Sequence, residues 1–486
     1  MRKFESFVQL IKYKVLKEVA LLAMEGTLEE KKGDIPKRVV PGPKPTTRCC
    51  IHKEHAILQE RVALAMGGDR KNPNIIEVID IACDECPIDR FTITEACRGC
   101  LAHKCSDVCP VDAIYYVGQR AYIDSNKCKE CGKCKEACPY NAISEVMRPC
   151  MRACGAHALS ITEDKKAEID NDLCIQCGAC VYQCPFGAIM DKSYIVDIIK
   201  LLKEAKENPN LRVYGVMAPA ISSQFTYAKI GQVVSGIKKL GFHNVVEAAL
   251  GADIIALHET QEFIDTIQER KVMTTSCCPA FVAYIEKNYP NLIHHISNSV
   301  SPMVAIGRLI KSTDPDAKVV FIGPCTAKKR EAQEEDIKDA VDYVMTFEEL
   351  QAMLDAMDIQ VEECEEAPLD NASFYGRIFA RSGGVTEAIQ HIIEEKKLDL
   401  ELKPISCDGL RECERALKML KVGRLPGNFI EGMACVSGCI GGAASLSHGP
   451  KDKKEVDKYG KLAIEQNISD SLRIFDLEKI QLGRQK

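Results

Sequence analysis

The stretch KVMTTSCCP at residues 271–279 joins a short apolar run to two adjacent cysteines and a proline. A second run, KVVFI at residues 318–322, leads into Gly-Pro-Cys in the same way. Both runs have the length of buried strands. In open α/β sheets, ligands bind where the carboxyl ends of strands meet, so we expect these loops to converge on one crevice. A third element, EGMACVSGCIGG at residues 431–442, ends in small residues that allow close approach of backbone to a bulky group.

The chain from residue 191 onward alternates such runs with helical periodicity. Residues 211–217 form another strand-like run, and residues 346–357 have helical spacing. At 486 residues the chain exceeds one ordinary hydrophobic core. We therefore predict a multidomain α/β (α+β) protein with three parts: a helical segment at 1–75, a cysteine-rich region at 76–190, and a C-terminal α/β domain at 191–486.

The composition is that of an ordinary globular protein, with 46% apolar and 28% charged residues. A net charge of −6 gives no reason to expect nucleic acid or an anionic membrane as a partner. No stretch approaches the roughly 18 apolar residues of a membrane span.

Residues 4–24 predict an amphipathic helix that packs on its own protein. Four prolines at 33–47 predict a turn-rich break, and Cys49 and Cys50 after it are interpreted as small loop residues.

Most of the 26 cysteines lie in Cys-x-x-Cys runs that end in Cys-Pro. No signal peptide is recognised, so disulfides are a poor explanation. We expect metal ligation by thiolates in a reducing cytoplasm.

The run at 128–139 has the spacing of a bacterial ferredoxin, in which three cysteines hold one cubane and the fourth holds its neighbour. Its partner half lies at 97–110. Together they predict an inner ferredoxin at about 95–142. Exchange of the fourth ligands gives two quartets: Cys97, Cys100, Cys105 and Cys138; Cys128, Cys131, Cys134 and Cys109.

A second complete run at 174–185 has no contiguous partner half. Two fragments on either side of the inner ferredoxin supply one if that ferredoxin is inserted in an outer one. The quartets of this outer ferredoxin are Cys83, Cys86, Cys150 and Cys184; Cys174, Cys177, Cys180 and Cys154. This arrangement resembles four-cluster electron-transfer subunits. A zinc ribbon, with two Cys-x-x-Cys pairs about fifteen to twenty residues apart, is the alternative, mainly for the outer fragments.

Across about residues 76–450 the chain resembles the iron-only (FeFe) hydrogenases. Three motifs match the family's in order: Thr-Ser-Cys-Cys-Pro at 275–279, Pro-Cys-x-x-Lys-x-x-Glu at 324–331, and Glu-x-Met-x-Cys-x-x-Gly-Cys at 431–439. The resemblance implies a two-lobed catalytic domain and an H-cluster, a cubane joined to a di-iron unit with CO, cyanide and a dithiolate amine. It implies that Cys439 bridges the two parts, and that the cubane ligands are Cys278, Cys325, Cys435 and Cys439.

The same resemblance implies roles around that cofactor. Lys328 would donate to a cyanide ligand. Contacts to the cofactor are expected from Pro219, Ala220, Pro324 and Met433. Some positions differ from well-known members of the family and suggest a divergent subgroup: Gly323 where methionine is common, Met303 where glutamine is common, Ala220 where serine is often found, and Phe281 where tryptophan is usual.

Proton transfer is implied for Cys277, because the pKa of a thiol is adjustable by its surroundings. Glu259, Ser297 and Glu262 would continue the relay outward, with Glu331 supporting the path or the fold. The arginine expected at the exit is replaced by Thr266. The alternative for the acidic residues is a solvated helix face.

The predicted activity is reversible H2 oxidation and proton reduction, with electrons passing through four 4Fe-4S clusters to a ferredoxin-like carrier. H2 and protons are the reactants, and maturation proteins would supply the di-iron unit. The alternatives are an H2 sensor and an iron-sulfur assembly factor. No output domain is expected after residue 450, which disfavours a sensor. Buried small-residue roles are expected for Cys364, Cys407 and Cys413.

Overall fold

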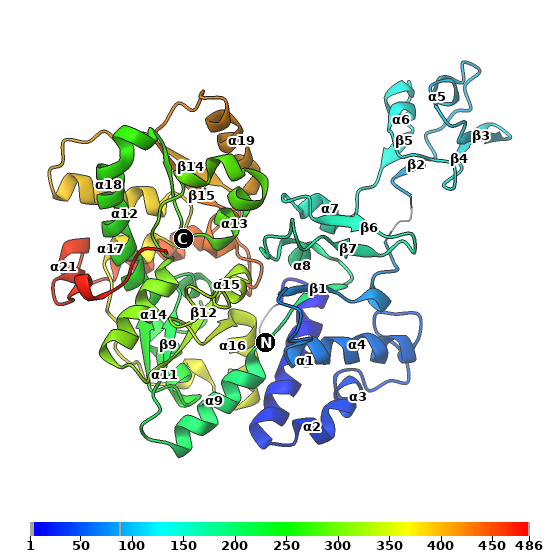
Figure 1. Ribbon diagram of the computed structural model, residues 1–486. Coiled ribbons are helices and arrows are strands. Elements are labelled where there is room, and N and C mark those ends of the chain that lie inside the picture. The colour runs from blue at the N-terminus through cyan, green and yellow to red at the C-terminus, as the bar shows by residue number, and fades with distance from the viewer. Residues whose placement is uncertain (1–3, 87–88, 485–486) are drawn as a thin grey trace.

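The computed structural model describes residues 4–86 and 89–484. Two parallel β-sheets surrounded by helices make up the C-terminal part (Figure 1), so the predicted multidomain α/β fold is confirmed. The strand order is β10-β9-β12-β13 in the larger sheet and β11-β15-β14 in the smaller. The strands are β9 Val213–Met217, β10 Asn244–Glu247, β11 Met273–Thr274, β12 Lys318–Gly323, β13 Tyr343–Thr346, β14 Pro404–Asp408 and β15 Phe429–Met433.

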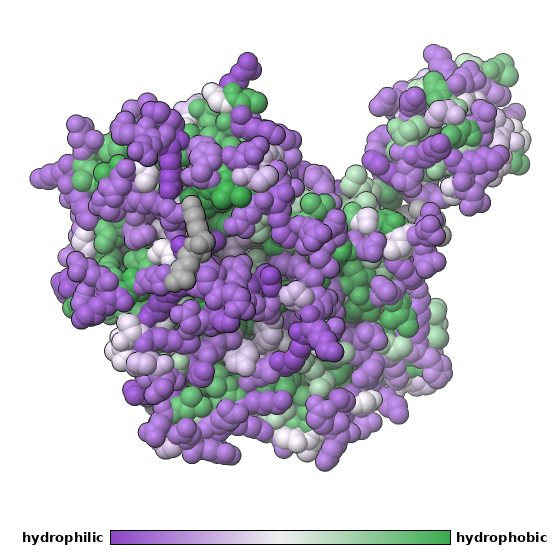
Figure 2. All heavy atoms as spheres, in the orientation of Figure 1, coloured by the Kyte–Doolittle hydropathy of each residue, from purple (hydrophilic) through white to green (hydrophobic). Residues whose placement is uncertain are grey.

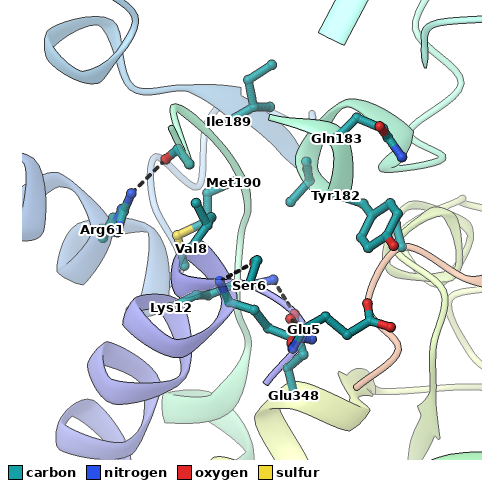
Figure 3. A pocket seen from close by; sticks show the side chains of 14 residues that line it. Glu5, Ser6, Val8, Lys12, Arg61, Tyr182, Gln183, Ile189, Met190 and Glu348 are labelled. Atoms are coloured by element: carbon teal, nitrogen blue, oxygen red, sulfur yellow. Dashed lines mark hydrogen bonds and ion pairs between the residues drawn. The ribbon is translucent and has the colours of Figure 1, made fainter. Parts of the chain in front are cut away.

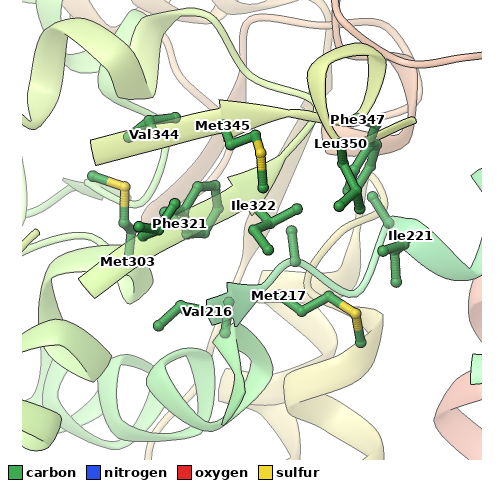
Figure 4. Packing of buried hydrophobic residues seen from close by; sticks show 14 of the residues in the cluster. Val216, Met217, Ile221, Met303, Phe321, Ile322, Val344, Met345, Phe347 and Leu350 are labelled. Atoms are coloured by element: carbon green, nitrogen blue, oxygen red, sulfur yellow. The ribbon is translucent and has the colours of Figure 1, made fainter. Parts of the chain in front are cut away.

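The larger sheet is buried on both faces, as parallel sheets are. Its strands carry Val216, Ile322 and Val344, all at most 1% exposed. By register Val216 and Val344 lie on one face of the sheet, and Ile322 lies on the other, toward Phe347 and Leu350 of a covering helix (Figure 4). The helices of the C-terminal part are α9 Ile195–Glu207, α10 Ile221–Gln224, α11 Ile230–Lys239, α12 Ala248–Arg270, α13 Pro279–Asn288, α14 Pro302–Thr313, α15 Ala327–Glu331, α16 Phe347–Ala356, α17 Phe374–Ile378, α18 Gly384–Glu395, α19 Leu410–Lys421, α20 Asp452–Lys461 and α21 Ile468–Leu472.

The long helix α12 and its neighbour α14 approach each other closely at Gly251. A Cβ atom there would lie 2.2 Å from the carbonyl oxygen of Pro302, so only glycine permits this contact. The helix extends to Arg270, and Lys271 ends it with a positive φ of 63°. The strand predicted at 271–275 is therefore shortened to the two residues of β11.

The described part of the cysteine-rich region contains four antiparallel strand pairs, three of which are nested in sequence. The outermost pair, β1 Ile76–Val78 with β8 Ile189–Asp191, encloses β2 Phe91–Ile93 with β5 Ile143–Glu145, which in turn enclose β3 Ile114–Val117 with β4 Arg120–Ile123. The fourth pair is β6 Leu159–Ile161 with β7 Ala167–Ile169. Short helices accompany them: α5 Lys104–Asp107, α6 Lys133–Ala137, α7 Pro149–Ala153 and α8 Ala179–Gln183. The strands β2–β5 form a small lobe that projects from the rest of the molecule (Figures 1 and 2).

The N-terminal segment is helical, as predicted, with α1 Phe7–Glu25, α2 Leu28–Lys31, α3 Ile35–Val39 and α4 Ile51–Ala65. The apolar side of α1 includes Val15, Leu16 and Val19, all fully buried in the core shared with the C-terminal domain. The predicted break at 33–47 is partly helical, because Pro36 lies in the first turn of α3, where its missing N–H breaks no helical hydrogen bond. Within the described residues, no helix has the length and apolar character needed to cross a bilayer.

Candidate functional site

The three C-terminal motifs lie where strands of the two sheets end. Cys278 follows β11 and precedes α13, Cys325 follows β12, and Cys435 follows β15. The strands β11 and β15 pair with each other, whereas β12 belongs to the larger sheet. The loops therefore meet between the two sheets, which is the convergence that the strand-like runs predicted.

The thiols of these loops lie beside one another on partly buried cysteines. Burial, with the charge of Cys278 as a smaller contribution, raises the pKa of Cys325 to about 11 and that of Cys439 to about 12. Burial also holds the pKa of Cys435 well above its usual range, and the neighbouring thiolates Cys325 and Cys278 add to the effect. Four thiols that repel one another when ionised suit a metal centre, since metal ligation requires thiolates.

The backbone brings the second and third motifs into contact. A Cβ atom on Gly442 would lie 2.5 Å from the carbonyl oxygen of Pro324. Among the residues with described positions, no three His, Cys, Asp or Glu side chains converge closely enough to hold a single metal ion.

Lys328 is buried in the same place, at 8% exposure. Its Nζ donates to Glu331 Oε2 at 2.9 Å and to Ser301 Oγ at 3.1 Å. Glu331 Oε1 is buried and has no hydrogen-bond partner in the described part of the chain. An ammonium with a free donor position and an orphaned acceptor beside it fit a polar ligand group in the adjacent space.

A row of polar side chains leads from Cys277 to the surface of α12. Cys277 is buried, and burial followed by the charge of Glu259 holds its pKa well above the usual range. Glu259 is fully buried and accepts hydrogen bonds from Ser276 N and Oγ, both at 3.1 Å. Burial raises the pKa of Glu259 to about 7, and its Oε2 lacks a partner among described residues. This carboxyl is not on a solvated helix face.

Ser297 continues the row. Its Oγ donates to Glu262 Oε2 at 2.7 Å, and the nearby hydroxyl of Ser297 also favours ionisation of Glu259. The backbone N–H of Asn298 donates to both oxygens of Glu262 at 3.0 Å. The structure thus brings together the four side chains Cys277, Glu259, Ser297 and Glu262 in the order the resemblance implied.

The outer end of this row carries an arginine that sequence comparison by spacing missed. Arg270 Nη1 donates to Glu262 Oε1 at 2.9 Å, whereas Thr266 only donates to the backbone oxygen of Glu262 within the helix. Arg270 lies eight residues after Glu262, two turns along the same helix, so it reaches the carboxylate from farther away. The helical period would have allowed this pairing to be found.

The other expected contacts line the same strand ends. Pro219 and Ala220 follow β9, Pro324 follows β12, and Met433 ends β15; all are buried. The divergent residues Met303 and Phe281 are fully buried. A Cβ atom on Gly432 would lie only 2.1 Å from the nearest ring carbon of Phe281. Phe281 therefore packs against the backbone of the third motif.

The sixteen upstream cysteines fall into four groups in space. Three small cavities are lined by one predicted quartet each: Cys97, Cys100, Cys105 and Cys138; Cys109, Cys128, Cys131 and Cys134; Cys154, Cys174, Cys177 and Cys180. The remaining quartet is also gathered, since burial and then the charges of Cys184, Cys86 and Cys83 raise the pKa of Cys150 to about 11.

One upstream quartet adjoins the C-terminal site. The charge of Cys177 acts on Cys435, and that of Cys325 acts on Cys177, whose pKa burial raises to about 12. The backbone also links the two regions, because Thr326 Oγ1 donates to the carbonyl oxygen of Gln176 at 2.8 Å.

Three comparisons with known proteins agree with this geometry. Residues 211–443 match the family model for the C-terminal domain of the iron only hydrogenase large subunit, and residues 121–144 and 167–190 match the 4Fe-4S binding domain. Iron hydrogenase 1 of Clostridium pasteurianum is 31% identical over 403 residues, covering 72% of this chain and 69% of that protein. Cytosolic iron-sulfur assembly component 3 of Bos taurus is 28% identical over 275 residues, covering 45% of this chain and 57% of that protein.

Among solved structures, an FeFe hydrogenase from Chlamydomonas reinhardtii superimposes with a TM-score of 0.50 at 20% identity, over 60% of this chain and 98% of that one. This likeness concerns the fold alone. The identity and coverage shared with the clostridial enzyme, together with both domain matches, define the relationship. The chain belongs to the iron-only hydrogenase family, as a divergent member that carries ferredoxin-like iron-sulfur motifs ahead of its hydrogenase domain.

Proposed function

We propose that the chain is an FeFe hydrogenase that oxidises H2 to two protons and two electrons, and reverses this reaction. The observation that carries the proposal is the buried row from Cys277 through Glu259 and Ser297 to Glu262, which begins beside the four C-terminal thiols. A protein that only holds or passes on clusters has no use for such a row.

The cofactor would be held by residues that fit it. Cys278, Cys325, Cys435 and Cys439 would ligate the cubane, and the Lys328 ammonium would donate to an anionic ligand of the di-iron unit. When bound, that unit supplies an open iron position at which hydrogen is split or formed. Pro219, Ala220, Pro324 and Met433 would enclose it and exclude water.

The side chains of the row would carry the proton. Cys277 accepts or gives a proton at Sγ, and Glu259 exchanges it at the unpartnered Oε2. A carboxyl with a pKa near 7 is suited to this exchange, because neither protonation state is strongly favoured at neutral pH. Ser297 Oγ donates to Glu262, from which Arg270 and solvent are reached.

Electrons would leave through four 4Fe-4S clusters. The quartet that contains Cys177 adjoins Cys435, and the small lobe formed by β2–β5 lies farthest from the C-terminal site in the view of Figure 1. We infer that a ferredoxin-like carrier docks at this lobe, and that the inner ferredoxin is inserted in the outer one. Maturation proteins would deliver the di-iron unit to a cytoplasmic, anaerobic enzyme.

Iron-sulfur assembly is the second candidate, favoured by the similarity to the bovine assembly component. The burial of Cys277 and Lys328 beside the quartet weighs against it, because an assembly factor needs neither a relay thiol nor a donor to a diatomic ligand.

Infrared spectroscopy of anaerobically matured protein, combined with a measurement of H2 turnover, tests the proposal. CO and cyanide bands together with turnover are expected. Cubanes alone, with no diatomic bands and no turnover, would favour the assembly role. Diatomic bands with very slow turnover would point to a sensor.

A further inference from the structure

The quartet of Cys83, Cys86, Cys150 and Cys184, called the outer quartet below, is surrounded by three buried arginines. The side chain of Arg48 is 4% exposed, and the residues Arg61 and Arg148 are 7% and 6% exposed. Arginine stays charged in proteins, so each brings a permanent positive charge into a poorly solvated place.

Arg48 and Arg61 hold backbone close to cysteines of the quartet. Arg48 Nη2 donates to the oxygens of Phe186 at 2.9 Å and Ala82 at 3.5 Å. Arg61 Nη2 donates to Gly187 at 3.0 Å, and a Cβ on Gly187 would lie 2.5 Å from that nitrogen. Arg61 lines one side of a cavity of about 230 Å³ between α1, α8 and β8 (Figure 3).

Arg148 lies two residues before Cys150. Its Nη2 donates to the carbonyl oxygen of Lys165 at 2.9 Å, and its charge favours the thiolate of Cys86. The charge of Cys184 likewise favours protonated Arg61. The guanidinium groups of Arg148 and Arg61 are therefore within electrostatic reach of thiols of the quartet.

Two of these guanidinium groups have an unused donor. Arg48 Nη1 and Arg148 Nη1 are buried, and neither has a hydrogen-bond partner in residues 4–86 and 89–484. A buried donor without an acceptor costs about 1–3 kcal/mol, and more when it is charged. Thiolate and sulfide sulfurs of a cubane would supply acceptors at this position.

Nearby acidic groups offset the arginines only in part. Asp84 and Glu85, between two cysteines of the quartet, lie 3.7 and 3.8 Å from Arg48 Nη1, and their side chains are 27% and 43% exposed. Asp84 is also paired with Lys53. Solvent screens these partly exposed carboxylates more than it screens the buried guanidinium groups.

The small lobe offers a contrast. Arg120 acts on Cys97 and has an unpartnered Nε, but its Nη1 donates to Glu95 at 2.5 Å. The Arg120 side chain is also 31% exposed, so solvent screens its charge more than it screens the buried guanidinium groups of the outer quartet. Of the quartets in the described chain, the outer one alone is faced by two buried guanidinium groups with free donors.

We propose that Arg48 and Arg148, assisted by Arg61, give the cluster of the outer quartet the highest reduction potential of the upstream clusters, so that an electron rests there between turnovers. This inference deepens the proposed function and rests on it for its purpose. Positive charge and N–H donors stabilise the reduced cubane, which carries one more negative charge.

A cluster that keeps one electron between turnovers suits the stoichiometry of H2 oxidation. One H2 yields two protons and two electrons, whereas a cubane accepts one electron and a ferredoxin-like carrier removes one at a time. A cluster that holds one electron allows the second to leave or arrive separately. It also gives the N-terminal segment, which contributes Arg48 and Arg61, a role in electron transfer.

Potentiometric titration followed by electron paramagnetic resonance tests the proposal on the full chain reconstituted with cubanes only. The signal of the outer cluster is assigned by its loss in Cys86→Ser. In Arg48→Met and Arg148→Met its midpoint potential should fall. Arg48→Lys and Arg148→Lys, which keep the charge and lose the planar fork, should give intermediate values.

Arg70→Met is the matched control. Arg70 belongs to the same N-terminal segment but pairs with Asp197 at the surface, with its side chain 61% exposed. Its loss should leave every potential unchanged. The proposal is overturned if the assigned signal is not the first of the upstream clusters to be reduced, or if both methionine variants retain its potential with full iron content. Because no di-iron unit is present, failure of the hydrogenase proposal cannot produce either result.

Discussion

The upstream quartets and the C-terminal quartet are built in opposite ways. In the small lobe, ligands come from compact sequence runs and lie near the surface; Cys131 is exposed. The C-terminal thiols come from loops after β11, β12 and β15, spread from residue 278 to residue 439, and lie partly buried beside charged groups. Local motifs are enough to hold an electron carrier. Chemistry at a cofactor needs strands from two sheets to place acids, thiols and a lysine around it.

This contrast is tested most severely at Cys277. If the C-terminal quartet differs from the others by having a proton donor, Cys277→Ala should reduce H2 turnover by about 10²–10⁴-fold, the usual contribution of a general acid or base. The CO and cyanide bands should persist, because Cys277 is not a proposed ligand. Cys49→Ser, at an exposed thiol in the N-terminal segment, should leave turnover unchanged. Equal loss in both variants would mean that Cys277 has no special role.

The two regions are joined by a buried ion network, which gives the next largest effect. Lys329, next to Lys328 in the second motif, pairs with Asp191 at 2.9 Å and Glu349 at 2.7 Å, and Asp191 also pairs with Lys12 of α1. Lys329→Met should destabilise the chain by about 3–5 kcal/mol, because it leaves buried carboxylates without a partner. Chemical denaturation of both proteins measures the difference in their free energy of unfolding.

Lys338→Met is the matched control for that change. Lys338 pairs with Glu335 at the surface, where ion pairs contribute about 1 kcal/mol or less. Similar stability for the two variants would show that the network does not bind the regions together.

Much of this architecture could be predicted from the sequence. Fixed cysteine spacings identified the ferredoxin quartets, and apolar runs of strand length placed Cys278 and Cys325 at strand ends. Contacts between distant elements were not predictable: nothing in the periodicity of α1 places Lys12 on Asp191. Arg270 was missed although it lies on the same helix as Glu262, because a side chain can reach a carboxylate from two helical turns away. The short β11 reflects competition between strand propensity and the extension of α12.

The two regions also contain acids that respond to pH in opposite directions. Burial raises the pKa of Glu259 from 4.5 to about 7, whereas ion pairs with Lys135 and Arg90 lower that of Glu145 on β5. Between pH 4.5 and 7 the native chain retains the Glu259 proton that the unfolded chain has lost. The stability contributed by Glu259 therefore falls as pH rises through this window and is flat above about pH 7.

Denaturation of cluster-free protein across pH 4.5–8 isolates this effect. The free energy of unfolding of wild type minus that of Glu259→Gln should fall with rising pH. The same difference for Glu145→Gln should show no such fall, because a lowered pKa contributes stability that is lost only as pH drops. A flat difference for Glu259→Gln would contradict its burial as a protonated acid.

The smallest expected effect concerns the exit of the proton row. The Arg270–Glu262 pair is partly buried, with side chains 17% and 9% exposed, and such a pair contributes about 1 kcal/mol. We expect its loss to raise the activation free energy of turnover by about this amount. Arg270→Met should then slow turnover about fivefold and shift its pH profile.

Thr266→Arg in the same background places the guanidinium one helical turn from Glu262, at the spacing where side chains of a helix meet. Recovery of turnover in the double variant would show that the exit needs a cation beside Glu262, whichever turn supplies it. A double variant as slow as Arg270→Met would instead tie the defect to the contact between Arg270 and the backbone oxygen of Ile296, which a residue at 266 has no reason to replace.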